Sequence, residues 1–179
     1  MMLLTIDIGN TSIAFGVFQG KRLKSTWKIS TQSVFSKETI RLPKDIDAAI
    51  ISSVVPKATP VVKKIVTKKY NIRPFVLGEN IKAPIKNLYR NPRQVGQDRL
   101  VDAVAVKELY SCPAIVIDFG TAITFDIISK KGDYLGGIIV PGIETSVMAL
   151  SKQAALLPII KVSAPKELVG RDTVSSMKS

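Results

Sequence analysis

The sequence predicts a mixed α/β protein built from two copies of one unit, and its pattern of apolar runs and turns supports this. Near the N-terminus, the apolar run Met2–Ile6 leads into Asp7–Thr11, and a second apolar run follows. The same order recurs later, where Ala114–Ile117 leads into Asp118–Thr121 and another apolar run. Self-similarity of this kind is typical of a duplication, with the two Asp-x-Gly turns facing a shared cleft. A chance recurrence is the alternative because Asp-x-Gly is a common turn, but the matched flanks favour duplication.

The first half is expected to begin with a strand hairpin and to continue as alternating strands and helices. Asp47–Val55 is almost continuously apolar and stops at Pro56, a pattern typical of a strand buried on both faces. Thr59 and Pro60 then predict the N-cap and first residue of a helix. The expected elements are strands at 2–6, 13–18, 23–30 and 47–55, a helix at 59–69, a short strand at 74–77, a loop at 81–93 and a helix at 96–110.

The second half is expected to repeat this beginning. Ala114–Ile117 has the pattern of another buried strand, and Ile123–Ile128 and Leu135–Val140 predict two more. Pro141-Gly142 is expected to open a helix. No linker-like change in composition separates the halves. The repeated pattern therefore predicts a first domain over residues 1–110 and a second over residues 111–179.

The composition excludes several kinds of catalysis. The 179 residues are 46% apolar and 22% charged, which is typical of a globular chain with a core of its own. The chain has no histidine and a single cysteine, Cys112. Ser-His-Asp triads, thiolate zinc sites and internal disulfides are therefore excluded. Any catalysis must use carboxylates, hydroxyls, backbone amides and bound cations.

The net charge of +12 raises the expectation of anionic partners. The lysines are scattered and aromatic residues make up only 6% of the chain, so nucleic acid is not expected as the main partner. No apolar run approaches the length of a membrane span, and the N-terminus lacks the features of a signal peptide. We therefore expect a soluble protein of the cytoplasm.

Three segments contain residues suited to phosphate chemistry. The turn amides of Gly9–Thr11 and of Gly120–Thr121 can donate to phosphate oxygens, and the aspartate at each turn can hold a cation against them. In the third segment, Gly96 permits close backbone approach, Asp98 begins a helix and can accept a hydroxyl proton, and Arg99 can bind a substrate carboxylate. The alternative for Asp98 is a residue that only complements the helix dipole.

Taken together, these motifs resemble those of the type III pantothenate kinases. The order and spacing match across essentially the whole chain, in the motifs Asp7-Ile8-Gly9-Asn10-Thr11, Ser52-Ser53-Val54-Val55-Pro56, Asn91-Pro92 with Val95-Gly96 and Asp98-Arg99, Asp118-Phe119-Gly120-Thr121, and Tyr134-Leu135-Gly136-Gly137 with Pro141-Gly142. The resemblance implies a duplicated actin-like (ribonuclease H-like) fold, with mixed sheets flanked by helices. It also implies ATP-dependent phosphorylation of pantothenate, the first step of coenzyme A synthesis, by a homodimer that uses Mg²⁺ and a monovalent cation, K⁺ or NH₄⁺.

The resemblance implies a role for individual residues as well. Asp98 is the expected proton acceptor, and Asp118 the expected ligand of the monovalent cation. The implied ATP contacts are Asp7, Ile8, Gly9, Asn10, Thr11, Ser12, Ile13, Ala14 and Thr121. The implied pantothenate contacts are Tyr89, Gly96, Gln97, Asp98, Arg99 and Thr173.

The chain departs from the family pattern in two places. The segment between Thr31 and Ile50 is shorter than usual, and the family continues beyond the position of Ser179, so we expect an incomplete second domain.

Two alternative functions stay open. One alternative is a non-catalytic regulatory or nucleic-acid-associated relative, against which the complete set of acidic and basic motif residues argues. The other is a different small-molecule kinase of the same fold, against which only the segment Gly96–Arg99 argues.

Overall fold

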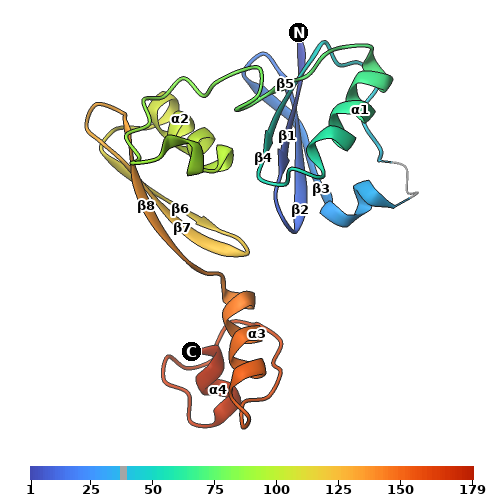
Figure 1. Ribbon diagram of the computed structural model, residues 1–179. Helices are drawn as coiled ribbons and strands as arrows, with labels where there is room; N and C mark the ends of the chain where they lie inside the picture. Colours follow the sequence, from blue (N-terminus) through green and yellow to red (C-terminus); the bar gives the residue numbers. More distant parts are fainter. Residues whose placement is uncertain (37–39) are drawn as a thin grey trace. The chain divides into compact units, whose positions relative to one another are not determined.

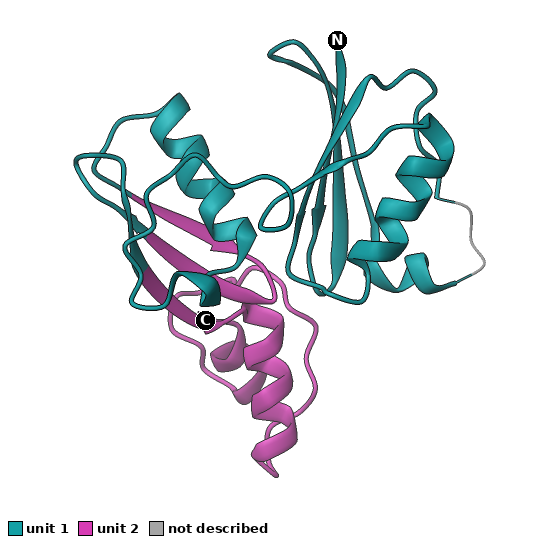
Figure 2. Ribbon diagram, turned by 45° about the horizontal axis from the view of Figure 1, so that its top comes forward, with its two compact units in different colours: residues 1–114, 127–136 teal, residues 115–126, 137–179 magenta. Residues whose placement is uncertain are grey.

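The computed structural model describes residues 1–36 and 40–179 (Figure 1). Residues 37–39, part of the shortened segment between Thr31 and Ile50, lie outside the described residues. The strands are β1 (Met2–Ile8), β2 (Ser12–Gln19), β3 (Arg22–Ser30), β4 (Ala48–Ser53), β5 (Phe75–Val76), β6 (Ala114–Phe119), β7 (Ala122–Ile128) and β8 (Tyr134–Pro141). The helices are α1 (Thr59–Tyr70), α2 (Gln97–Leu109), α3 (Ile143–Gln153) and α4 (Thr173–Lys178), with short 3₁₀-helices at Thr31–Phe35 and Pro92–Gln94. The chain divides into two compact units, residues 1–114 with 127–136 and residues 115–126 with 137–179 (Figure 2).

A mixed sheet of five strands, in the order β3-β2-β1-β4-β5, forms the centre of the first unit. β1, β2 and β3 form an antiparallel meander, as the hairpin pattern predicts, whereas β4 runs parallel to β1 and β5 runs parallel to β4. Ile8 pairs with Ser53 at the carboxyl ends of β1 and β4. These parallel strands therefore end along one edge of the sheet, and the first Asp-x-Gly turn begins at that edge.

The core of this unit consists mainly of aliphatic side chains, most of them from the sheet and from α1, together with Phe15 and with residues of the segments after β3. Figure 1 shows α1 beside the sheet. Val62 and Val66 of α1 are buried in one cluster with Leu4 and Ile6 of β1 and Ile51 of β4. Burial of each such side chain contributes about 1.5–3 kcal/mol to folding. The cluster fixes β1 against β4 and with them the sheet edge that carries the turn.

The two motif aspartates lie in strands, and the prediction that they belong to polar turns is wrong in this detail. Asp7 is part of β1 and Asp118 is part of β6. Asp7 pairs with Ala14 on one side and with Ser52 on the other. Pairing with two neighbouring strands extends β1 past its polar residue, so the turn shortens to the residues after Ile8.

The prediction that Thr59 caps α1 is also wrong. Thr59 is the first residue of the helix, and Ala58 occupies the cap position. The Oγ1 atom of Thr59 instead lies 2.8 Å from Ser53 Oγ and 3.1 Å from Val55 O, within hydrogen-bond distance of both. The hydroxyl therefore ties the helix back to the end of β4.

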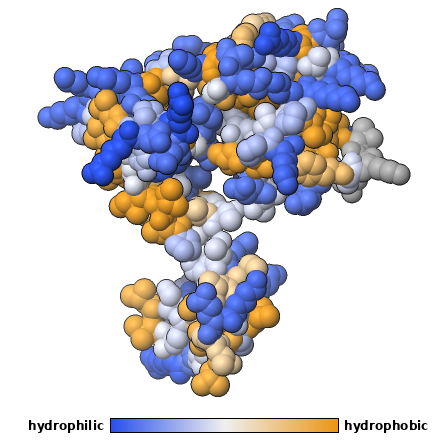
Figure 3. Space-filling model, in the orientation of Figure 1, coloured by the Kyte–Doolittle hydropathy of each residue, from blue (hydrophilic) through white to orange (hydrophobic). Residues whose placement is uncertain are grey.

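The second sheet has the strand order β6-β7-β8, and much of its apolar surface is exposed. Ile115, Ile117 and Phe119 of β6 are 63%, 47% and 70% exposed, which contradicts the prediction of a buried strand. A continuous apolar run suits burial on both faces, but it does not specify which element covers each face. Apolar side chains also reach the surface around α3 and α4 (Figure 3). None of the helices in residues 1–36 and 40–179 has the length and apolar character to cross a membrane.

Candidate active site

The first Asp-x-Gly turn joins β1 to β2, and hydrogen bonds hold its backbone. Gly9 N donates to Ser12 O at 3.0 Å and closes the turn. Thr31 donates from Oγ1 to Gly9 O at 2.7 Å and from its backbone N–H to Thr11 O at 3.0 Å. Asp7 and Thr11 are exposed beside this turn. A backbone turn with an accessible carboxylate can bind a phosphate group together with its cation.

The other predicted ATP contacts differ in how much of their side chain a ligand can reach. Ile8 and Ile13 pair with each other and are fully buried, so any contact they make with a nucleotide runs through the backbone. Ser12 and Ala14 are half-buried, and Asn10 is exposed. The apolar pair therefore supports the turn from within the core.

The second Asp-x-Gly turn belongs to the second unit, where the start of α3 holds it. Thr121 O accepts hydrogen bonds from Gly142 N at 3.0 Å and from Thr145 Oγ1 at 2.7 Å. A Cβ atom on Gly142 would collide with the carbonyl oxygens of Gly120 and Thr121, so this close approach requires glycine. Asp118 and Thr121 are exposed. The sequence prediction that Pro141-Gly142 opens a helix is confirmed, since Gly142 is the N-cap residue of α3, but the sequence did not indicate the contact of Gly142 with this turn.

The carboxylates at these turns fit a cation that keeps part of its water shell. Within the described ranges, no three or more His, Cys, Asp or Glu side chains gather into a group that could hold a metal ion. Mg²⁺ is usually held by one or two carboxylates together with substrate phosphates and water. Asp7, exposed at the first turn, suits that mode of binding, and Asp118 is a second exposed carboxylate that a cation can reach at the other turn.

The N-terminus of α2 brings Gly96, Asp98 and Arg99 together. Asp98 lies in the first turn of the helix and is half-buried, and its Oδ1 accepts a hydrogen bond from Arg99 N at 2.8 Å. A Cβ atom on Gly96 would collide with Asp98 Oδ1 and lie 3.3 Å from Val54 Cγ1. The φ angle of Gly96 is −58°, which any residue can adopt, so glycine is required here for space alone. The helix N-terminus stabilises an ionised carboxylate, the form that a proton acceptor needs.

Arg99 and Tyr89 pack around Tyr134, a residue to which sequence reasoning gave no role. Tyr134 is fully buried, and its ring centroid lies 5.8 Å from Arg99 Cζ and 6.4 Å from the ring centroid of Tyr89. Tyr134 N donates to Lys86 O and Tyr134 O accepts from Leu88 N, both at 2.9 Å. Tyr134 therefore joins the segment before Tyr89 to β8 and supports the guanidinium group through its ring face. The sequence could have indicated a role for Tyr134 through the motif Tyr134-Leu135-Gly136-Gly137, in which an aromatic residue precedes two glycines.

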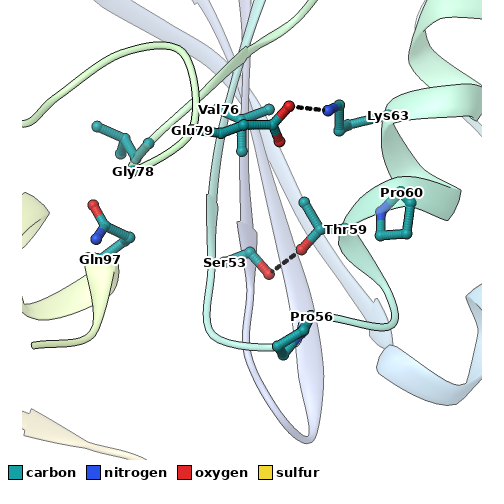
Figure 4. A pocket seen from close by; sticks show the side chains of 10 residues that line it. Ser53, Pro56, Thr59, Pro60, Lys63, Val76, Gly78, Glu79 and Gln97 are labelled. Carbon is teal, nitrogen blue, oxygen red and sulfur yellow. Dashed lines mark hydrogen bonds and ion pairs between the residues drawn. The ribbon is translucent and has the colours of Figure 1, made fainter. Parts of the chain in front are cut away.

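A pocket of about 380 Å³ opens at the carboxyl edge of β4 and β5, beside the start of α2 (Figure 4). Gln97, the residue before Asp98, lines it together with Ser53. Lys63 of α1 and Glu79 form an ion pair on its wall. Sequence reasoning missed this pair because Lys63 is one of several lysines on α1, and only the fold brings Glu79 to it.

Thr173, the last predicted pantothenate contact, begins α4 in the second unit. Asp172 Oδ1 accepts a hydrogen bond from Ser175 N at 2.8 Å, and Ser175 Oγ accepts one from Asp172 N at 3.0 Å. The hydrogen bonds from Ser175 hold the pKa of Asp172 below its ordinary value. Thr173 lines a hollow of about 620 Å³ together with Arg171.

The predicted site residues therefore form separate groups. In the first unit, the structure brings together the residues at the start of α2 and the aromatic residue beside them, namely Gly96, Gln97, Asp98, Arg99 and Tyr89. The first turn belongs to the same unit, whereas Asp118, Thr121 and Thr173 belong to the second.

Comparison with known proteins gives consistent matches over almost the whole chain. A family model described as type III pantothenate kinase matches residues 3–179. Among curated proteins named type III pantothenate kinase, one from Moorella thermoacetica is 42% identical over 190 residues, which cover 99% of this chain and 75% of that protein. One from Geobacter sulfurreducens is also 42% identical over 190 residues, covering 99% of this chain and 74% of that protein.

Solved structures are similar at lower identity. A crystal structure from Campylobacter jejuni, described as a conserved Baf family transcriptional activator, has a TM-score of 0.59 at 23% identity, covering 98% of this chain and 71% of that one. A structure from Sinorhizobium meliloti, described as a 2-dehydro-3-deoxygalactonokinase protein, has a TM-score of 0.50 at 10% identity, covering 86% and 58%. These likenesses concern the fold alone and confirm the predicted actin-like class. The match of the family model and the identity to its curated members show that the chain belongs to the type III pantothenate kinase family.

Proposed function

We propose that the protein transfers the terminal phosphoryl group of ATP to the primary hydroxyl of pantothenate, the first step of coenzyme A biosynthesis. The family consists of kinases that act on pantothenate. The observation that best supports the assignment is the geometry at the start of α2. There, the Asp98 carboxylate occupies the space that a Cβ atom on residue 96 would need, and it accepts a hydrogen bond from Arg99 N. This places one carboxylate of fixed position at a helix N-terminus, next to a pocket.

In the proposed reaction, Asp98 is the proton acceptor. It removes the proton from the primary hydroxyl as that oxygen bonds to the terminal phosphorus of ATP. The bond between this phosphorus and the bridging oxygen breaks at the same centre, and ADP leaves with the electron pair. Phosphoryl transfer depends mainly on positioning and electrostatics, so a chain without histidine can carry it out.

The phosphates of ATP are proposed to bind the first turn through its backbone amides, with Thr121 as a further contact. Asp7 is the proposed ligand, directly or through water, of the divalent ion that accompanies ATP. When bound, this ion neutralises charge on the phosphate oxygens. Asp118 is the proposed ligand of a monovalent cation, K⁺ or NH₄⁺, because it is an exposed carboxylate beside a rigid turn.

Pantothenate is proposed to bind beside Asp98. Gln97 lines the adjoining pocket, while Tyr89 and Arg99 pack around the buried ring of Tyr134. A guanidinium group suits the carboxylate of this substrate, and Thr173 is a further proposed contact. Contacts with both the carboxylate and the hydroxyl of the substrate would fix its position, which is the main requirement for in-line transfer.

A coupled assay that follows ADP release tests the function directly. We expect turnover with pantothenate and MgATP, and faster turnover when K⁺ or NH₄⁺ is added. Release of ADP that does not depend on pantothenate, or faster release with a sugar or another small alcohol, would assign the chain to a different kinase of this fold.

Substitution of Gly96 by alanine is expected to lower kcat by about 100-fold, because the new Cβ displaces the Asp98 carboxylate and small misplacements are costly in phosphoryl transfer. The φ angle suits alanine, so α2 should keep its helical circular dichroism. In a double-variant cycle, G96A/D98N should be no slower than D98N alone. A further loss in the double variant would show that Gly96 acts independently of Asp98.

We also propose that the protein is a homodimer with residues 135–160 at the contact. Leu135, Ile138 and Ile139 of β8 are 45%, 58% and 61% exposed, and Ile143 and Met148 of α3 are exposed as well. Exposed apolar side chains in such number are normally covered by association, and a twofold contact covers them on both copies.

Sedimentation equilibrium at micromolar concentration should give a dimer or a larger species. The variant Ile139→Lys should shift the protein toward monomer, whereas Leu23→Lys, at an exposed apolar position on β3, should not. A wild-type protein that sediments as a stable monomer would rule out this interface.

The proposed location is the cytoplasm. The single cysteine, Cys112, needs no oxidising compartment, and ATP is the proposed phosphoryl donor. Fractionation of cells that express the tagged protein would test this location.

A further inference from the structure

We infer that Thr31 is a positioning residue for nucleotide binding: by holding two carbonyl groups of the first turn, it fixes the turn and directs the backbone N–H of Asn10 toward the phosphates. This inference rests on the proposed function, because it takes the first turn as the site of the ATP phosphates. Neither the spacing of the motifs nor the family resemblance gave Thr31 a role.

The contacts that support this inference come from one side chain and one amide. Thr31 Oγ1 donates to Gly9 O at 2.7 Å, and Thr31 N donates to Thr11 O at 3.0 Å. The residue is only 2% exposed, so water does not compete freely for these bonds. Two of the carbonyl groups of the turn, those of Gly9 and Thr11, thus accept hydrogen bonds from one buried residue.

The position of Thr31 follows from strand register. Ser30 is the last residue of β3 and pairs with Ser12, which places Thr31 beside Thr11. The side chain of Ser30 accepts a hydrogen bond from Gln32 N at 3.3 Å and so starts the 3₁₀-helix at this point. The backbone at Thr31 is therefore fixed from both sides of the residue.

Because the peptide bond is planar, a contact that fixes a carbonyl group also fixes the direction of the N–H group of the next residue. In a trans peptide, the C=O of one residue and the N–H of the next point in opposite directions. Since Gly9 O points toward Thr31, the N–H of Asn10 points away from it, at an exposed residue of the turn. The N–H of Ser12 instead faces Gly9 across the hairpin, because Ser12 O accepts from Gly9 N and both groups of a strand residue lie on one side. A backbone N–H presented at a turn can donate to a phosphate oxygen.

The hydroxyl of Thr31 is the part of this arrangement that mutation can remove cleanly. Valine has the shape of threonine and keeps the backbone N–H, so Thr31→Val deletes only the bond to Gly9 O. The peptide between Gly9 and Asn10 can then rotate, and its carbonyl oxygen can turn toward the phosphates and repel them. Thr31→Ser keeps the hydroxyl and should restore binding.

Calorimetric titration with the Mg²⁺ complex of a methylene-bridged ATP analogue tests the inference without turnover. We expect Thr31→Val to weaken binding about 10-fold, the scale of one hydrogen bond, and Thr31→Ser to stay within about 3-fold of wild type. The KM for pantothenate should change by less than about 2-fold in both. Thr26→Val is the matched control, because Thr26 Oγ1 donates to Phe15 O at 2.9 Å on the same strand pair, away from the turn. Equal affinity in wild type and Thr31→Val would overturn the inference.

Amide NMR of the wild-type protein tests the direction of this N–H group without any variant. Addition of the same analogue should move the amide resonance of Asn10 downfield, with smaller changes at Thr31. Should Thr31→Val fail to fold, this measurement decides: an unmoved Asn10 amide in a protein that binds the analogue would refute the inference. A wild-type protein that does not bind the analogue would refute the proposed ATP site itself.

Discussion

Replacement of Asp98 by asparagine is expected to lower kcat by about 100-fold or more at saturating ATP and pantothenate. Asparagine keeps the size of the side chain and can still accept the hydrogen bond from Arg99 N, but it cannot take up the hydroxyl proton. General base catalysis typically contributes this much to a rate. The KM for ATP should stay within about 3-fold, because no ATP contact is removed.

A control on the same helix separates this effect from a change in charge. Glu108 is exposed near the end of α2, and Glu108→Gln should leave kcat within about 2-fold of wild type. Circular dichroism and thermal unfolding of both variants check the fold. If Asp98→Asn turned over at nearly the wild-type rate, Asp98 would be a residue that only complements the helix dipole.

Replacement of Asp118 by alanine is expected to remove the dependence of activity on K⁺ or NH₄⁺ together with most of the activity, a loss of about 100-fold. The turn should keep its shape, because Gly142 N and Thr145 Oγ1 hold the carbonyl of Thr121 rather than the carboxylate. What is lost is the negative charge that holds the proposed monovalent cation, and without that ion less positive charge is available to neutralise the phosphate oxygens during transfer. Initial rates over a titration of KCl at constant ionic strength measure the effect.

Glu167→Ala serves as the matched control for Asp118→Ala. Glu167 is an exposed carboxylate of the same unit, paired with Arg171 at 3.2 Å, and its removal should leave the response to K⁺ unchanged. Equal wild-type rates with and without monovalent cations would remove this role from Asp118 while leaving the fold assignment intact.

The sequence could predict the parts of the fold that depend on residues close together in the chain. The β1–β3 meander, α1 and α2 follow from alternation, helical spacing and turn residues, all of which act between near neighbours in the chain. The start of α2 was also accessible, because Gly96, Asp98 and Arg99 are adjacent in sequence and keep that adjacency in space.

Contacts between distant segments were not accessible in this way. Hydrogen bonds between Tyr134 at the start of β8 and residues 86 and 88 place the ring of Tyr134 beside Arg99 and Tyr89. The residues near Tyr134 in the chain do not indicate these partners. The exposure of Ile115 on β6 illustrates the same limit for burial. An apolar pattern indicates that a strand tends to be buried, but it does not say which element of the fold covers it. The wrong cap at Thr59 arose because a nearby strand end competes for its hydroxyl.

The first three strands lie at the start of the chain, and this position affects when the first turn can fold during synthesis. β1, β2, β3 and Thr31 lie within the first 31 residues, and every hydrogen bond described for the first turn comes from them. Three strands with one apolar face are the smallest sheet that can be stable alone, and hairpins form within microseconds. A ribosome adds residues far more slowly, so the first turn can take its shape before Asp98 has been synthesised. The turn proposed to bind the ATP phosphates is then already folded when α2 is made.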